Sequence, residues 1–279
     1  MSNLKEIKNR IKSIKSIIKI TNTMKIVSSL NFKKFKNLYF YSKLYYNNLY
    51  NIIKSFYKEI NFFYKKKNNS NNILYIIITS NKGLCGNFNS FIIKNFIKKI
   101  TPNKNIFIFN IGNIGKKTLS KIYNIYDSKD IFKKNIKYKE IYNIVNNLIK
   151  DFFLEKFNSI KLVVNNDIKN QKFNIISFLP IKVKYLDYKK SFYYKNYIIE
   201  PNKEEFIKKI FHNFLISKLY FFILKSYMLE NKIRMITMHK SEENSNNIKN
   251  NLLKKYNKNR KESITNSLLE IINGYNSIK

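Results

Sequence analysis

The sequence predicts an α/β domain with a mainly parallel sheet, inserted between two long terminal helices that form an antiparallel coiled coil. Residues 2–64 contain neither proline nor glycine, and residues 202–279 contain no proline and one glycine, Gly274. Between them, short apolar stretches alternate with helical stretches, which is the pattern of a sheet built from crossover units. We expect an N-terminal coiled-coil helix at residues 1–64, the α/β domain at 70–195 and a C-terminal coiled-coil helix at 200–279.

The N-terminal segment has apolar side chains at alternating three- and four-residue spacing, which predicts one long helix. The spacing begins with Leu4, Ile7, Ile11, Ile14 and Ile18, and resumes with Phe35, Leu38, Ser42, Tyr45, Leu49, Ile52 and Phe56. Between these stretches we expect the seam to pass through Ile20, Met24 and Val27. The heptad phase then shifts once, as at a stutter. A pair of shorter bundle helices is the alternative.

The C-terminal segment shows mixed three- and four-residue spacing at both of its ends. Its apolar positions include Phe206, Ile210 and Phe214, and then Ile264, Leu268, Ile271 and Tyr275. A helix of this length spans on the order of 110 Å, which no compact domain can bury. Its apolar seam therefore needs a long partner. Residues 1–64 are the simplest partner, and projection of the helix into another protein is the alternative.

Four apolar stretches of the central segment are expected to be strands, at residues 73–79, 106–111, 160–165 and 173–179. Continuous β-branched runs of this kind are typical of strands that are buried on both faces. Helical patterns at residues 89–100 and 138–157 lie between them. We therefore expect a Rossmann-like domain.

The formal net charge of +37, from 54 basic and 17 acidic residues, is typical of proteins that bind nucleic acid or anionic surfaces. Arginine, however, occurs only at Arg10, Arg234 and Arg260, and alanine and tryptophan are absent. The abundant residues, Lys, Asn, Ile, Tyr and Phe, have A/T-rich codons, so we interpret most of the charge as compositional background. A basic coiled-coil protein that binds nucleic acid stays open as an alternative.

Two glycine motifs, at residues 83–86 and 112–115, follow predicted strands where a dinucleotide-binding turn would lie. Neither has the G-x-G-x-x-G spacing or the G-x-x-x-x-G-K-[ST] pattern of a phosphate-binding loop. We interpret both as tight turns in which glycine supplies positive φ or close packing. A dinucleotide-dependent enzyme is the second alternative.

No constellation of catalytic residues stands out. Cys85 is the single cysteine, which excludes an intrachain disulfide and indicates a reducing compartment; we expect it to be buried. The two histidines, His212 and His239, lie far from it in the sequence, and acidic residues are scattered. We therefore expect no catalytic residue, cofactor or metal site. No apolar run approaches the ~18 residues of a membrane span, and the N-terminus lacks the apolar run of a secretory signal.

Several separate segments resemble the gamma subunit of F-type ATP synthases. They are residues 6–15 (EIKNRIKSIK), 20–27 (ITNTMKIV), 83–86 (GLCG) with Asn89, Arg234 and Met235 with Met238, 256–260 (YNKNR), and 263–265 (SIT) with Glu270 and Ile271. Their order matches that of the family, and together they span nearly the whole chain. The chain departs from the family pattern at Lys261, Asn266 and Ser267.

This resemblance implies a non-catalytic central rotary stalk that couples proton flow through the membrane sector to ATP synthesis. The implied partners are three alpha and three beta subunits per copy of this chain, an epsilon subunit and a ring of c subunits, with no nucleic acid. The implied location is the cytoplasmic side of a bacterial inner membrane, reached only through the complex. Met24, Lys25 and Arg234 are the implied coupling contacts with beta. Arg260, Thr265, Asn266 and Glu270 are the implied upper hexamer contacts, and Glu200 is a foot contact.

Overall fold

The computed structural model describes residues 2–57, 59–60, 70–129, 138–165, 173–181, 199–200 and 202–276. The chain divides into two compact units, one of Met1–Leu30 with Arg234–Lys279 and the other of Asn31–Ile233. Both divisions fall inside long helices, α1 (Ser2–Ser55) and α7 (Lys203–Asn276), so each helix contributes to both units. The three domain ranges expected from the sequence remain a prediction, and residues 182–195 lie outside the described part.

The larger unit contains a five-stranded sheet of order β3-β2-β1-β4-β5. Its strands are β1 (Ile73–Ile78), β2 (Ile106–Ile111), β3 (Asn124–Lys129), β4 (Ser159–Asn165) and β5 (Phe173–Leu179). All neighbouring pairs are parallel except β4 and β5, which are antiparallel. This arrangement confirms the expected fold class.

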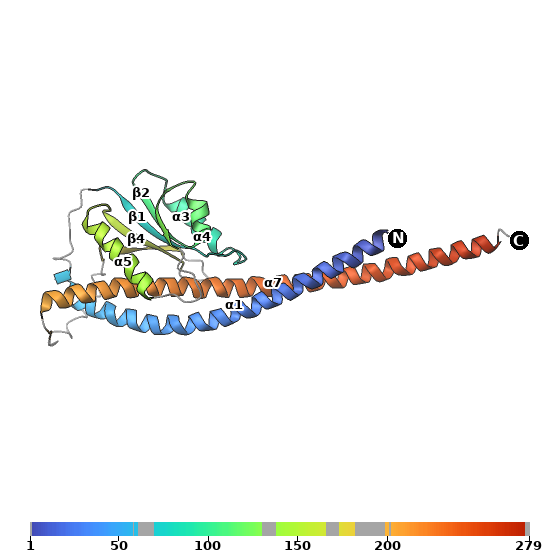
Figure 1. Cartoon of the computed structure of the whole chain (residues 1–279), viewed down its shortest axis with the longest axis horizontal. Coiled ribbons are helices and arrows are strands. Elements are labelled where there is room, and N and C mark those ends of the chain that lie inside the picture. Colours follow the sequence, from blue (N-terminus) through green and yellow to red (C-terminus); the bar gives the residue numbers. More distant parts are fainter. Residues whose placement is uncertain are drawn as a thin grey trace. The chain divides into compact units, whose positions relative to one another are not determined.

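Helices cover both faces of the sheet (Figure 1). Alternate residues of a strand point to opposite faces. Leu74 and Ile76 of β1 accordingly pack with α1, α7 and α5 (Tyr138–Phe153), whereas Tyr75 and Ile77 pack with α3 (Phe88–Lys99) and α4 (Asn113–Leu119). Because both faces are covered, β1 and its neighbours can be apolar throughout.

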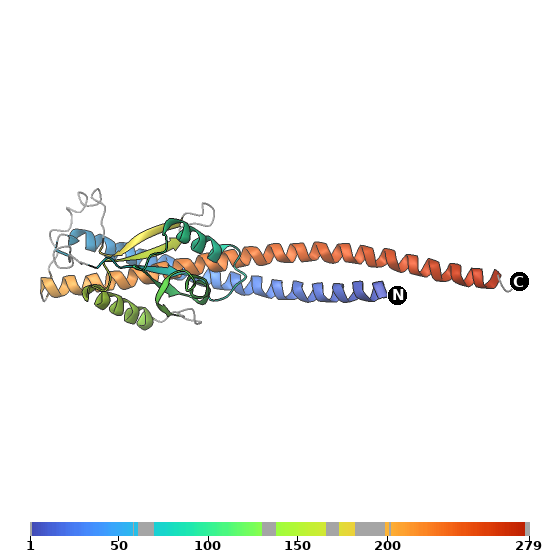
Figure 2. The same cartoon turned by 90° about the horizontal axis from the view of Figure 1, so that it is seen from above.

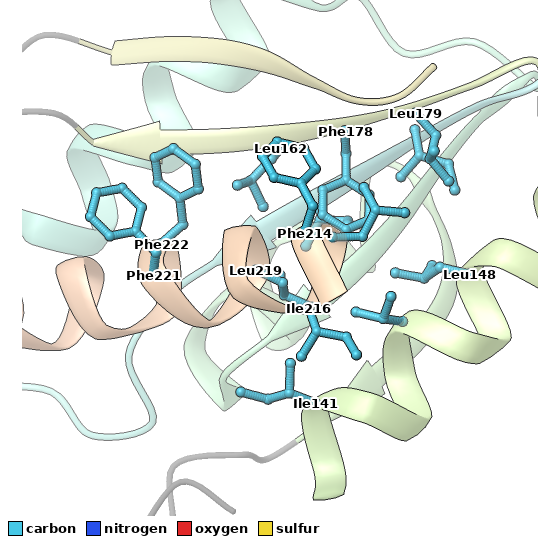
Figure 3. Close-up of a cluster of buried hydrophobic side chains, with 14 of the residues drawn as sticks. Ile141, Leu148, Leu162, Phe178, Leu179, Phe214, Ile216, Leu219, Phe221 and Phe222 are labelled. Carbon is cyan, nitrogen blue, oxygen red and sulfur yellow. The ribbon is translucent and has the colours of Figure 1, made fainter. Parts of the chain in front are cut away.

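The first part of α7 is the centre of the larger core. Between Phe214 and Leu224 every residue except Tyr220 is buried, so the helix is apolar on nearly all sides. Figure 3 shows Phe214 beside Phe178 of the sheet and Ile216 facing Ile141 of α5. The helix is therefore enclosed by the sheet, α5 and α1 in this unit.

Two elements were not expected from the sequence. The edge strand β3 has the polar sequence NIYDSK. Among the described strands, it pairs only with β2. The short helix α4 begins immediately after Gly112, in the second glycine motif. In addition, α5 ends at Phe153 and not at residue 157, and Glu155 in the following turn has a positive φ of 59°.

The predicted stutter in α1 is wrong. The buried and half-buried positions follow one unbroken alternation of four and three residues along the helix: Ile7, Ile11, Ile14, Ile18, Thr21, Lys25, Ser28, Phe32, Phe35, Tyr39, Ser42, Tyr46, Leu49 and Ile53. The expected seam residues Ile20, Met24 and Val27 are exposed, and so are Leu38 and Tyr45. The true seam lies one residue further along at each of these places, where small hydroxyl residues such as Thr21 and Ser28 let the helix pack closely.

Candidate functional site: the surfaces of the paired helices

In the smaller unit, α1 and α7 run antiparallel and side by side in both views (Figures 1 and 2). The seam of α7 mirrors that of α1 in its three- and four-residue spacing, through Met238, Glu242, Ser245, Lys249, Leu252, Tyr256, Asn259 and Ser263. Thr21, Ser28 and Ser245 are 7%, 2% and 7% exposed. The Thr21 hydroxyl donates to the carbonyls of Ile17 and Ile18 in its own helix, so its burial leaves no donor unsatisfied.

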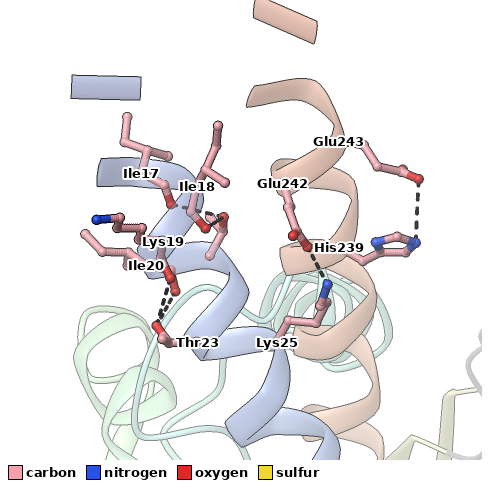
Figure 4. A network of polar contacts seen from close by, with 10 residues as sticks. Ile17, Ile18, Lys19, Ile20, Thr23, Lys25, His239, Glu242 and Glu243 are labelled. Atoms are coloured by element: carbon pink, nitrogen blue, oxygen red, sulfur yellow. Dashed lines mark hydrogen bonds and ion pairs between the residues drawn. The ribbon is translucent and has the colours of Figure 1, made fainter. Parts of the chain in front are cut away.

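An ion pair joins the two helices inside this seam. The Lys25 ammonium lies 2.5 Å from the Glu242 carboxylate, and their side chains are only 29% and 17% exposed. Figure 4 shows the two side chains directed toward each other, whereas His239 and Glu243 pair along the outer side of α7. Partial burial removes solvent screening, so this pair interacts more strongly than a surface ion pair.

A second apolar stripe runs along α1 beside the seam. Ile17, Ile20, Met24 and Val27 repeat at three- and four-residue spacing and are between 37% and 57% exposed. An apolar stripe at this spacing is suited to packing against another protein surface. Three of these residues, Ile20, Met24 and Val27, were expected inside the coil and instead lie on its outer surface.

The seam of α7 ends before the helix does. From Ile264 to Asn276 every residue is exposed, although the helix continues (Figure 2). Exposed apolar side chains in this last part, here called the overhang, are Ile264, Leu268, Leu269, Ile271, Ile272 and Tyr275. The described residues of α1 do not cover them.

All of the predicted contact residues except Glu200 lie in the smaller unit. Arg234 is half-buried, and Met24 is 37% exposed beside the seam residue Lys25. Arg260, Thr265, Asn266 and Glu270 are exposed at the seam end and on the overhang, where the Thr265 hydroxyl donates to the Lys261 carbonyl at 3.0 Å. Glu200 is exposed in the larger unit, just before α7 begins.

The glycine motifs of the larger unit are structural turns, as expected. Gly86 and Gly112 have φ values of 55° and 103°, which favour glycine. Gly115 is closely packed, and its amide donates to the Thr79 hydroxyl at 3.0 Å. Each motif therefore has a structural role in the backbone.

Leu229 and Ile233 of α7 belong to one buried cluster with Cys85, Phe88 and Val163. Cys85 is 2% exposed, as predicted, and its sulfur accepts a hydrogen bond from the Asn89 amide at 3.1 Å. Among the described residues, no group of His, Cys, Asp and Glu could hold a metal ion, and no helix is long and apolar enough to cross a membrane.

Two polar groups of the larger unit were not singled out from the sequence. Lys218 is 5% exposed within the apolar part of α7, and its ammonium donates to the Ser177 carbonyl at 2.6 Å. Asp151 of α5 accepts hydrogen bonds from Tyr126 and from Lys156. The sequence signal for the buried Lys218 was a lysine inside an apolar helical run. Nothing in the sequence indicated the hydrogen bonds of Asp151.

Known proteins resemble this chain along its length. Residues 3–278 match the sequence model of a family described as ATP synthase. The ATP synthase gamma chain of Flavobacterium johnsoniae is 34% identical over 98% of both chains, and that of Christiangramia forsetii is 32% identical over 98% of both. A chain of the Euglena gracilis mitochondrial ATP synthase, in an OSCP/F1/c-ring structure, aligns with a TM-score of 0.69 at 16% identity, covering 99% of this chain and 95% of that one. The last similarity supports the fold.

Proposed function

This chain belongs to the family of ATP synthase gamma chains, and from that premise we propose that its paired helices are the rotating shaft of the enzyme. A gamma chain is a non-catalytic subunit of the ATP synthase complex, so the catalytic residues belong to partner subunits. The shaft turns when protons flow through the membrane sector. Its asymmetric surface then drives the catalytic subunits through their open and closed states, and ATP is made and released.

The observation that carries this proposal is the exposed apolar surface of the smaller unit. The stripe from Ile17 to Val27 and the overhang from Ile264 onward both repeat at helical spacing without being covered by the described part of the chain. Apolar surface of this extent is expected to be buried in a partner. A hexamer of alpha and beta subunits that encloses the helices would bury both regions.

We assign the coupling contacts with beta to Met24, Lys25 and Arg234. Met24 belongs to the exposed stripe, and Arg234 begins the α7 part of the smaller unit. Basic groups in this region would be attracted to a moving acidic loop, an attraction that salt weakens. The Lys25 ammonium is directed to Glu242 inside the coil.

We assign the upper hexamer contacts to Arg260, Thr265, Asn266 and Glu270. Support comes from the exposure of all four side chains, Arg260 at the end of the seam and the other three on the overhang. Polar side chains at the edge of an apolar surface are typical of a protein interface. We propose that the larger unit is the foot of the shaft and that its partners are the epsilon subunit and the ring of c subunits. We assign Glu200 to the contacts of this foot.

We further propose that the chain is peripheral to a bacterial inner membrane, on its cytoplasmic side, and joins the membrane only through the complex. Support comes from its bacterial gamma-chain relatives. Ion transport is then a property of the assembly. A role in nucleic-acid binding has no support in the comparisons, since the matched family and relatives are ATP synthase proteins.

Co-purification with alpha and beta subunits from the same operon tests the proposal. We expect one copy of this chain per three alpha and three beta subunits, measured by native mass spectrometry. Another stoichiometry, or no association, contradicts it. As a matched comparison, thermal unfolding with and without a dinucleotide tests the enzyme alternative, because a ligand that binds the native state raises the melting temperature.

A further inference from the structure

We propose that the ion pair between Lys25 and Glu242 fixes the axial register of the coiled coil in the smaller unit, and that Lys25 is a positioning residue. Its consequence for energy coupling rests on the proposed function. The register itself is a property of this chain. The pair can fix the register because both side chains belong to the seam and join different helices at 2.5 Å.

The other seam residues that α1 contributes to the smaller unit do not set the register by themselves. In the described stretch of α1 from Leu4 to Ser28, Lys25 is the one charged seam residue, and the others are aliphatic or carry a hydroxyl group. Aliphatic side chains pack almost equally well against several apolar neighbours, so a slip of one heptad would preserve most of their contacts. A buried polar pair distinguishes between such alternatives, because its charges need each other.

The neighbouring seam positions agree with this register. Because the helices are antiparallel, the next seam positions on one side of the ion pair are Thr21 of α1 and Ser245 of α7, and on the other side they are Ser28 and Met238. Thr21, Ser28, Ser245 and Met238 are all less than 9% exposed. Buried seam residues, three of them small, therefore flank the ion pair on both sides.

A slipped register would leave the charges without partners. Moving α7 by one heptad, about 10 Å, would place Lys25 opposite Lys249 in one direction and opposite Met235 in the other. The first brings two ammonium groups together. The second leaves Lys25 against an apolar side chain and sets Glu242 against Ile18. Each outcome partly buries an unpaired charge, which is strongly unfavourable.

Charge reversal with cross-linking tests the register in the full chain. Cysteines at positions 21 and 245 report the observed register, and cysteines at 21 with 238 or 252 report the slipped ones; the native Cys85 is buried. We expect Lys25→Glu or Glu242→Lys to lower the 21–245 disulfide yield roughly tenfold relative to the slipped pairs, and the double reversal to restore it. Glu243→Lys is the matched control, since Glu243 is exposed and pairs within α7.

Unchanged yield in the single variants, or no recovery in the double variant, overturns the proposal. A second measurement separates positioning from direct contact with beta, using ATP-driven proton pumping by the assembled complex. Positioning predicts that Lys25→Gln and Glu242→Gln lower pumping equally and that their effects do not add. Loss only in Lys25→Gln contradicts it. Failure of one-per-hexamer assembly, by contrast, contradicts the proposed function and leaves the cross-linking result standing.

Discussion

The Tyr126 hydroxyl donates a hydrogen bond to the Asp151 carboxylate and thereby ties the edge strand β3 to the end of α5. Burial, followed by the hydrogen bond and the negative charge of Asp151, raises the pKa of Tyr126 to about 12. Lys156 lies 2.7 Å from the other oxygen of the same carboxylate. The neutral phenol is therefore part of the folded structure of this edge.

Removing that hydroxyl is expected to weaken the larger unit. We expect Tyr126→Phe to lower the free energy of unfolding by about 1 kcal/mol, because Asp151 loses one of its donors while Lys156 remains. Because the folded pKa lies above the ordinary value of 10.0, the stabilisation by Tyr126 is present below pH 10 and is lost as the pH rises toward 12. Urea unfolding measures the change, and Tyr142→Phe, at a residue that is 43% exposed, is the control.

Lys218 is expected to make the free energy of unfolding rise with pH, which is the opposite of the effect of Tyr126. Burial lowers its pKa from 10.5 to about 8, so folding below pH 8 encloses a charge that is absent above pH 10.5. The free energy of unfolding should rise by about 3 kcal/mol across this interval. Lys218→Met should abolish the rise, whereas Lys209→Met, at an exposed position of the same helix, should keep it. Melting temperatures measured from pH 7.5 to 10 test this, and an equal rise in all three proteins contradicts it.

The space around Gly115 is too small for a side chain. A Cβ atom there would collide with the Asn110 side-chain oxygen and lie 2.7 Å from the side chain of Thr79. We expect Gly115→Ala to cost about 1–3 kcal/mol in the free energy of unfolding, measured in urea. Gly83→Ala serves as the matched control, since its Cβ would meet nothing within 4 Å. Equal destabilisation by both changes would contradict the conclusion that space explains the glycine at position 115.

The coupling contacts predict a loss of coupling without a loss of assembly. Met24→Lys places a charge on the exposed stripe, and Arg234→Glu reverses the charge offered to an acidic loop. We expect each to lower ATP-driven proton pumping several-fold relative to ATP hydrolysis, at unchanged subunit stoichiometry. Asn22→Lys adds the same charge to an exposed position outside the stripe and should leave pumping intact. Normal pumping in both test variants argues against the contact assignment.

Substitutions on the overhang are expected to weaken association with the hexamer while the chain still folds. Leu268→Asn combined with Ile271→Asn removes apolar surface that is more than half exposed in this chain. We expect an unchanged melting temperature of the isolated chain but roughly tenfold weaker association with the hexamer. Ile11→Asn, at a seam position that is 8% exposed, should instead lower the melting temperature. Native mass spectrometry and thermal unfolding distinguish the two effects.

The long helices, the buried strands and the family could all be predicted from the order of the amino acids. Helices as long as α1 and α7 follow from the missing proline and glycine, and strands such as β1 follow from continuous apolar runs. The polar strand β3 could not be predicted, because its identity comes from pairing with β2. The buried Cys85 and the turn role of the glycine motifs were also predictable from composition and spacing.

The stripe of α1 that faces α7 could not be predicted in this way and is seen only in the packed helices. Both candidates have heptad spacing, and the one that includes Ile20 and Val27 is the more apolar. The helices instead meet at Thr21, Lys25 and Ser28, where small side chains allow a close approach and Glu242 supplies the opposite charge. Hydrophobicity along one helix cannot reveal this choice, because burial depends on the shape and charge that the partner helix presents.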